Sequence, residues 1–189
     1  MNQPKVVHQL INKFGTFTVE ELIYEGRPAR VLFSGPLHAA QSGIPLDQNP
    51  RLLFDYNQCL LDLALELEPV RILVLGGGTM TLPMALLRQL PSAKLTVVEI
   101  NPDLIKLGLD YFNYRPDRRL RLVEADAAQF MSLARPTYDL VLTDIYDNFT
   151  VPAHFRTRQF AEQIERSLQS GGVVATNCIA GLSGESSKP

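Results

Sequence analysis

The sequence contains few of the residues and patterns that identify disulfide-rich, metal-binding or membrane-spanning proteins. Only two of its 189 residues are cysteines, Cys59 and Cys178, and neither has companions at metal-ligand spacing. We therefore expect both to be buried thiols in a reducing compartment. No apolar run approaches the ~20 residues that are needed to span a bilayer, and the N-terminus has no apolar signal core. These absences predict a cytoplasmic protein with no membrane partner.

The chain also lacks a block of charge of either sign. It has 18 Lys and Arg against 20 Asp and Glu, which gives a net charge of −2, so no nucleic-acid partner is expected. Neither a metal site nor a Ser-His-Asp arrangement can be traced in the sequence. A hydrophobic fraction of 46% over this length predicts one globular domain with a small extension.

The central pattern is an apolar strand that runs directly into three glycines. Arg71–Leu75 is mostly apolar and β-prone, Gly76–Gly78 follows at once, and a helix is expected over Met80–Leu90. This order opens a nucleotide-binding βαβ unit, because glycine lets the backbone turn tightly and approach a ligand. A plain turn is the alternative, since Thr81 stands where the full fingerprint has its third glycine.

The next strand carries an acidic residue at its end. Leu95–Ile100 is the predicted strand, and Glu99 lies 21 positions after Gly78. An acid at this distance reaches the ribose hydroxyls of a bound nucleoside, and a carboxylate can accept from two vicinal hydroxyls. The alternative is that Glu99 only ends a strand at the surface.

Three further strands alternate with helices, and two of these strands also end at acidic residues. Asp126 follows a strand over 119–123, whereas Asp144 and Asp147 follow one over 138–143. Helices are expected over 103–113, 127–134 and 158–169, with Gly171-Gly172 ending the last one before a strand over 173–178. Five alternations predict an α/β, Rossmann-like fold, with a mostly parallel sheet and helices on both faces. Ligands of such sheets bind at the carboxyl ends of the strands, where these acids lie.

Residues 1–49 are predicted to form an N-terminal β-hairpin extension, and residues 50–189 a Rossmann-like nucleoside-binding domain. The hairpin pairs Thr16–Tyr24 with Ala29–Phe33. Residues 37–43 are less regular, and their polar side chains, including Gln41, face either a ligand or solvent. A helix from Asn49 or Pro50 follows, with Tyr56 on its apolar face.

Two carboxylates three positions apart, Asp144 and Asp147, can divide acid–base work between them. One can accept a proton from an attacking nucleophile while the other holds a cationic substrate. Two acids this close together are expected to raise one another's pKa, which suits a general base. The alternative is a solvated loop with acidic caps.

The motifs together resemble the class I S-adenosylmethionine-dependent methyltransferase fold and, more narrowly, the spermidine/spermine synthase (aminopropyltransferase) family. The narrower resemblance rests on the triple glycine, on Asp144-x-x-Asp147, and on the hairpin followed by Gln41-Ser42 and a helix with Tyr56. Val151-Pro152-Ala153 resembles the family's loop over the active site. The segments that carry the fold-level resemblance are 72–78, 96–103, 124–127, 138–147 and 171–177.

The resemblance implies transfer of an aminopropyl group from decarboxylated S-adenosylmethionine to an amine, without a metal. Glu99 would hold the ribose, Asp126 the adenine amino group, and Asp144 would deprotonate the amine. The implied site consists of catalytic Asp144, of cofactor contacts from Gly76, Gly77, Gly78, Glu99, Ile100, Asp126 and Ala127, and of substrate contacts from Gln41, Tyr56 and Asp147.

The chain departs from the family pattern at three places. Thr79-Met80-Thr81 stands where the family has Asp-Gly-Gly, and Tyr56-Asn57-Gln58 where it has Tyr-His-Glu. The chain also ends soon after the fifth strand, so we expect either a truncated form or a partner chain over that sheet edge, which makes a homodimer a reasonable expectation.

Two other functions stay open. One is a methyltransferase that uses intact S-adenosylmethionine, favoured by the lost acid at Thr79. The other is a non-catalytic nucleoside-binding or oligomerisation module, favoured by the short C-terminus. A nicotinamide dehydrogenase is disfavoured, because Thr81 replaces the third glycine and Asp126 has no role in one.

Overall fold

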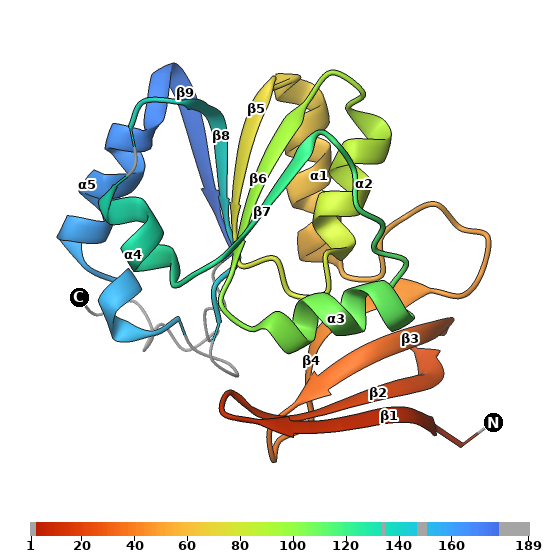
Figure 1. The fold of residues 1–189 in the computed structure, drawn as a ribbon. Coiled ribbons are helices and arrows are strands. Elements are labelled where there is room, and N and C mark those ends of the chain that lie inside the picture. The colour runs from red at the N-terminus through yellow and green to blue at the C-terminus, as the bar shows by residue number, and fades with distance from the viewer. Residues whose placement is uncertain (1–2, 134, 147–150, 178–189) are drawn as a thin grey trace, which may run out of the picture.

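The computed structural model describes residues 3–133, 135–146 and 151–177, and these residues form two β-sheets (Figure 1). The N-terminal sheet is antiparallel with the order β1-β2-β3-β4, and the second sheet is parallel with the order β7-β6-β5-β8-β9. The N-terminal strands are β1 (Lys5–Asn12), β2 (Gly15–Tyr24), β3 (Arg27–Ser34) and β4 (Ala39–Pro45). The parallel strands are β5 (Arg71–Leu75), β6 (Lys94–Glu99), β7 (Leu120–Glu124), β8 (Tyr138–Thr143) and β9 (Leu168–Thr176).

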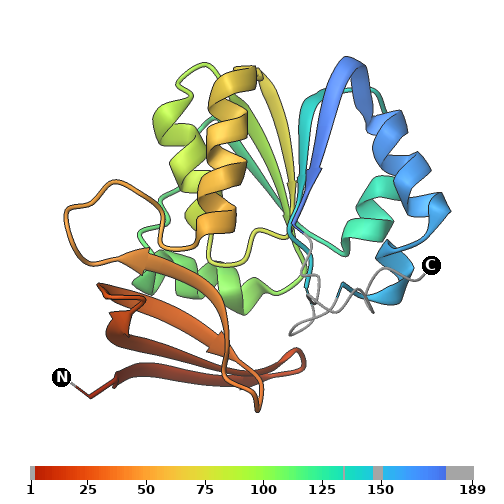
Figure 2. The ribbon, with the colours of Figure 1, turned by 180° about the vertical axis from the view of Figure 1, so that it is seen from behind.

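Helices cover both faces of the parallel sheet (Figures 1 and 2). The helices α1 and α2 pack on one face, and α4 and α5 pack on the other. The expected Rossmann-like α/β fold is therefore confirmed. The helices are α1 (Asp55–Leu67), α2 (Thr81–Gln89), α3 (Pro102–Tyr111), α4 (Ala127–Ser132) and α5 (Arg158–Ser167), with a short 3₁₀ helix η1 (Ala153–Phe155) before α5. None of the helices in the described ranges is long and apolar enough to cross a bilayer.

The central strand β5 is apolar on both sides because both of its faces are covered. Ile72 and Val74 pack under α1 and α2, whereas Leu73 and Leu75 pack under α4 and α5. All four side chains are fully buried. A continuous apolar run of this kind is typical of a parallel strand between two helical layers.

The helix α3 lies between the two sheets and joins them (Figure 1). Phe17 and Leu32 of the N-terminal sheet share a buried cluster with Leu107 of α3 and with Phe112, which follows it. The predicted start of this helix is confirmed, since Asn101 caps it by accepting a hydrogen bond from the Asp103 amide at 3.1 Å.

The expected hairpin is present as β2 and β3, but the extension is larger than the sequence indicated. The strand β1 precedes the hairpin, and residues 39–45 form β4, paired with β3, where an irregular stretch was expected. The prediction failed here because Ala39–Pro45 has little β propensity of its own. Pairing with β3 and a buried position for Ser42 stabilise the strand instead.

Two other expectations are wrong. The helix α5 ends at Ser167, and Gly171 lies inside β9, where the register against β8 shifts between Tyr138 and Leu140. Gly171 and Gly172 therefore lie in an irregular edge strand and do not end a helix. Cys59 is exposed, because α1 buries its neighbours Leu60 and Leu61 on the opposite side. Cys178 lies outside the described residues.

Gly76 is required by a close approach between two strand ends. Its φ is +89°, and a Cβ atom there would lie 2.2 Å from the backbone oxygen of Asp144. Gly171 has a similar φ of +79°, but no atom lies within 4 Å of the position that a Cβ would take.

We expect Gly171→Ala to cost about 1–2 kcal/mol of unfolding free energy from the left-handed backbone alone. Gly76→Ala should cost roughly 2 kcal/mol more, because the added Cβ overpacks the contact with Asp144. Urea unfolding of both variants measures the difference, and equal losses would contradict the steric explanation.

Candidate functional site

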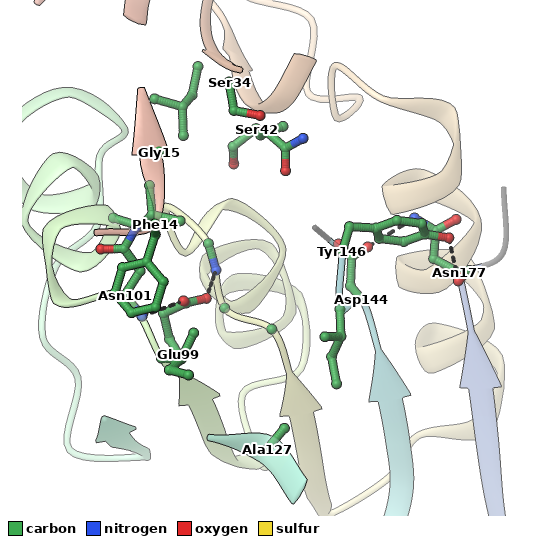
Figure 3. A pocket seen from close by; sticks show the side chains of 18 of the residues that line it. Phe14, Gly15, Ser34, Ser42, Glu99, Asn101, Ala127, Asp144, Tyr146 and Asn177 are labelled. Carbon is green, nitrogen blue, oxygen red and sulfur yellow. Dashed lines mark hydrogen bonds between the residues drawn. The ribbon is translucent and has the colours of Figure 1, made fainter. Parts of the chain in front are cut away.

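A cavity of about 620 Å³ lies between the carboxyl ends of the parallel strands and the N-terminal sheet (Figure 3). The strand order reverses between β5 and β8, because the chain leaves β5 toward β6 on one side and later returns to β8 on the other. Ligands of doubly wound sheets bind at such a reversal. The cavity is therefore where the sequence placed the functional site.

The structure brings together all of the predicted site residues that lie within the described ranges. Asp147 lies outside the described residues. The predicted residues that line the cavity are Gln41, Tyr56, Gly76, Gly77, Gly78, Glu99, Ile100, Asp126, Ala127 and Asp144. Six separate segments of the chain contribute them, from β4 to the end of β8.

Glu99 is buried at the end of β6 and is held by two backbone amides. Its Oε2 accepts a hydrogen bond from the Gly78 amide at 2.7 Å, and its Oε1 accepts one from the Asn101 amide at 2.8 Å. Burial raises the pKa of the Glu99 carboxyl, and the amides of Asn101 and Gly78 act in the opposite direction. The carboxylate thus fixes the glycine loop as well as facing the cavity (Figure 3).

Asp126 has a structural role that the sequence analysis did not assign. Its Oδ1 accepts hydrogen bonds from the Ala128 and Gln129 amides at 2.8 and 3.0 Å, so it caps α4. Ile100 lines the same part of the cavity with 45% of its surface exposed, and Ala127 is buried beside Asp126. This end therefore combines a carboxylate with apolar surface, which suits a purine base with an exocyclic amine.

Asp144 lies at the end of β8 within a hydrogen-bonded group of side chains. The Asn177 side-chain amide donates to its Oδ1 at 2.9 Å, and the Tyr56 hydroxyl also hydrogen bonds to it. Burial raises the pKa of the Asp144 carboxyl, while these two donors lower it. Burial and the nearby Asp144 charge raise the pKa of Tyr56. The Tyr146 hydroxyl donates to the Asn177 backbone oxygen at 2.7 Å. Figure 3 shows Asp144, Tyr146 and Asn177 on the wall opposite Glu99.

Sequence reasoning missed Asn177, although a usable signal was present. Asn177 follows the fifth strand directly, and the rule that assigned Glu99 and Asp144 to strand ends applies to it equally.

Sequence reasoning also missed three buried polar atoms that have no hydrogen-bond partner among the described residues. They are Ser34 Oγ, Asn57 Oδ1 and Asn101 Nδ2. All three residues line the cavity. Buried polar groups of this kind normally find partners, so a bound ligand or water is expected to supply them.

Thr79, at the position where the family pattern has an acid, does not line the cavity. It is fully buried, and its Oγ1 lies 2.6 Å from Ser42 Oγ, which is also 3.3 Å from Thr81 Oγ1. Ser42 and Thr81 themselves line the cavity. Three hydroxyl groups thus connect β4 to the glycine loop and make this part of the cavity neutral.

The charged groups that line the described cavity are almost all acidic. The acidic side chains are those of Glu99, Asp126 and Asp144. Among the described lining residues, His154 has the only basic side chain, and there is neither Lys nor Arg. Within the described ranges, no group of His, Cys, Asp or Glu side chains is arranged to hold a metal ion. Such a cavity favours a cationic ligand over a phosphorylated one.

Comparison with known proteins agrees with this geometry. The family model described as the spermine/spermidine synthase domain matches residues 53–179. A polyamine aminopropyltransferase of Vibrio vulnificus is 31% identical over 137 residues, which cover 70% of this chain and 46% of that protein. Putrescine N-methyltransferase 2 of Nicotiana tabacum is 29% identical over 130 residues, which cover 65% of this chain and 37% of that protein. The chain spans about half the length of the first curated relatives it matches.

A solved structure supports the fold over nearly the whole chain. A probable spermidine synthase from Corynebacterium glutamicum superposes with a TM-score of 0.76 at 23% identity, covering 92% of this chain and 64% of that one. The match includes the N-terminal sheet, because residues 53–179 alone would cover far less of the chain.

The hydrogen bond from Asn177 should lower the pKa of Asp144 measurably. Asn177→Leu removes a donor that stabilises the ionised carboxylate, so we expect this pKa to rise by about one unit or more, since hydrogen bonds to charged groups contribute roughly 1.5–3 kcal/mol. A titration of the aspartate side-chain carboxyl signals by carbon-13 NMR measures the shift. Asn177→Gln, which keeps the amide, should shift it less. An unchanged pKa in the leucine variant would show that burial alone sets it.

Proposed function

Because the chain belongs to the spermine/spermidine synthase family, we propose that it transfers an aminopropyl group from decarboxylated S-adenosylmethionine to a small amine. The observation that carries the proposal is the acidic cavity with Asp144 held at its wall. A sulfonium donor and an amine acceptor are both cations, so an acidic cavity attracts them. The absence of Lys and Arg from the described lining favours the decarboxylated donor, since intact S-adenosylmethionine brings a carboxylate that these acids would repel.

In the proposed complex the nucleoside lies between β5 and β7. The carboxylate of Glu99 accepts from the ribose hydroxyls, Asp126 accepts from the adenine amino group, and Ile100 and Ala127 contact the base. The glycine loop passes beneath the chain that carries the sulfur. Burial of Glu99 and its contact with the Gly78 amide support this arrangement, because a ligand there meets a carboxylate that the backbone already orients.

The proposed reaction is a single displacement at carbon. The amine nitrogen attacks the aminopropyl carbon next to sulfur, the carbon–sulfur bond breaks, and its electron pair stays on the sulfur of methylthioadenosine. Asp144 takes the proton that the amine nitrogen must lose. Tyr56 and Asn177 orient the carboxylate through their hydrogen bonds. Gln41 and Asp147 are proposed to place the acceptor amine.

We also propose that the chain divides into an extension, residues 1–49, and a nucleoside-binding domain, residues 50–189. We further propose a cytoplasmic location and a homodimer.

A second candidate is methyl transfer from intact S-adenosylmethionine to the same kind of amine. It is favoured by Thr79, which is neutral and faces Ser42 instead of the cavity. The similarity to a protein named putrescine N-methyltransferase 2 supports it as well. Both reactions use a nucleoside sulfonium and an amine, so they differ in which carbon next to sulfur is attacked.

The products of the two reactions distinguish the candidates. We expect mass spectrometry to detect methylthioadenosine and an aminopropylated amine when the protein is incubated with decarboxylated S-adenosylmethionine and a panel of diamines and polyamines. S-adenosylhomocysteine and a methylated amine, formed from intact S-adenosylmethionine, would replace the first proposal by the second. Neither product from a folded sample would favour a binding module.

Asp144→Asn should separate the chemical step from nucleoside binding. Asparagine keeps the size of the side chain but is not a base at neutral pH, so we expect kcat to fall by about 10²–10⁴-fold. The Kd for methylthioadenosine, measured by calorimetry, should change little because Asp144 lies opposite Glu99. Near-normal turnover in this variant would remove Asp144 as the base.

Glu99→Gln should show the reverse pattern. The glutamine side chain keeps one oxygen that accepts hydrogen bonds, but its NH₂ group would face the N–H of Gly78 or Asn101, and two donors cannot hydrogen bond to each other. One ribose hydroxyl would also lose its acceptor. We expect the Kd for methylthioadenosine to rise by at least about tenfold, as one unpaired buried group costs roughly 1–3 kcal/mol. Calorimetry with methylthioadenosine measures it, and unchanged affinity would contradict the ribose role.

A further inference from the structure

The turn between β1 and β2 reaches the cavity from the N-terminal sheet. Phe14 and Gly15, at this turn, line the cavity together with Glu99 and Asn101. Figure 3 shows Phe14 beside Asn101, on the Glu99 side of the cavity and across from Asp144. None of the motifs that identify the site includes these residues, which lie outside the segment that the family model matches.

A continuous set of hydrogen bonds connects this turn to the glycine loop. The Asn12 side-chain amide donates to Asn101 Oδ1 at 3.1 Å and to Asp103 Oδ2 at 2.6 Å, while Asn12 Oδ1 accepts from the Phe14 amide at 2.8 Å. The Asn101 amide donates in turn to Glu99, which also accepts from the glycine loop. The position of Phe14 is thereby fixed relative to the carboxylate of Glu99.

The Phe14 ring has the surroundings of a contact residue rather than of a core residue. It is half-buried and packs at the margin of the cluster formed by Phe17 and Leu32. The Lys13 ammonium lies 4.9 Å from its ring centroid, so part of the ring is covered by a cation. The ring also gives the cavity an apolar surface directly beside the carboxylate of Glu99.

We propose that the β1–β2 turn, residues 12–15, is a wall of the nucleoside site, with Phe14 covering the ribose and Asn12 as its positioning residue. The inference rests on the proposed function in that the ligand is a 5′-thio-substituted nucleoside. A ribose offers hydroxyls on one edge and carbon-bound hydrogens on its face. Glu99 suits the edge, and an aromatic ring suits the face. The N-terminal sheet then contacts the nucleoside through this turn, in addition to the acceptor amine that Gln41 of β4 is proposed to place.

Methylthioadenosine binding to the full chain tests the proposal. Calorimetry should show Phe14→Ala raising the Kd about tenfold, with a smaller rise for Phe14→Leu, which keeps an apolar side chain over the ribose. Asn12→Ala should raise the Kd by about threefold to tenfold, because the turn loses its attachment to Asn101.

Each of these variants has a matched control. Tyr24→Ala is the control for Phe14→Ala and should leave the Kd unchanged. Tyr24 is a half-buried aromatic at the other end of β2, packed against Phe54 outside the cavity. Asn49→Ala is the control for Asn12, since Asn49 Oδ1 also accepts a turn amide but lies outside the cavity.

Hydrogen exchange of the unmodified protein gives a readout that a purely structural role would not change. We expect methylthioadenosine to slow amide exchange at Phe14 and Gly15 and to leave the Glu25–Gly26 turn of the same sheet unaffected. Slowed exchange together with weakened binding in Phe14→Ala supports the proposal.

The two proposals fail in different ways. If the unmodified protein binds methylthioadenosine but Phe14→Ala binds it equally well, only the role of the turn is overturned. The same holds if exchange at the turn is unchanged by ligand. If the unmodified protein does not bind methylthioadenosine at all, the nucleoside site itself is overturned, and the turn's role with it.

Discussion

The pair of hydrogen bonds that Glu99 accepts from Gly78 and Asn101 determines how the site is assembled. A carboxylate buried at the end of a strand is costly unless donors compensate it. Here one oxygen faces the glycine loop and the other faces the start of α3. Losing the carboxylate would leave both amides buried without a partner. The same interaction therefore fixes the glycine loop, the first turn of α3 and, through Asn12, the N-terminal sheet.

The sequence predicted those parts of the site that depend on one strand and the turn after it. Glu99, Asp126 and Asp144 were predicted because each lies at or just after the end of a predicted strand, and parallel strands bring their carboxyl ends to one edge of the sheet. It could not predict Asn177 donating to Asp144, because that contact joins residues 33 positions apart through the pairing of β9 with β8. The strand β4 was missed for a related reason, since its stability comes from pairing with β3 and from Ser42 contacting Thr79.

Thr79 shows why a motif position alone does not decide chemistry. The sequence indicated a missing charge at the ligand, but the structure places this side chain in contact with Ser42, outside the cavity lining. A neutral hydroxyl there joins the two sheets without introducing a buried charge, which would need its own compensation. Two of the three acids that line the cavity lie on opposite walls, Glu99 on one and Asp144 on the other (Figure 3). The cavity thus has an acid on each of these two walls, whereas Ser42 and Thr81 line it with neutral hydroxyl groups.

The environment of Asp144 balances orientation against basicity. An alkyl ammonium has a pKa near 10 and a carboxyl near 4, so full proton transfer between them in water is unfavourable by about 8 kcal/mol. Burial raises the pKa of Asp144 and also disfavours the charged ammonium, which narrows this gap from both sides. Tyr56 and Asn177 act against the first effect, because their hydrogen bonds stabilise the ionised carboxylate. They also hold the carboxylate in one orientation at the end of β8. A base must first lie within hydrogen-bonding reach of the proton that it removes. The proposed reaction therefore tolerates some loss of basicity at Asp144, but it does not tolerate a carboxylate that is free to rotate away from the amine.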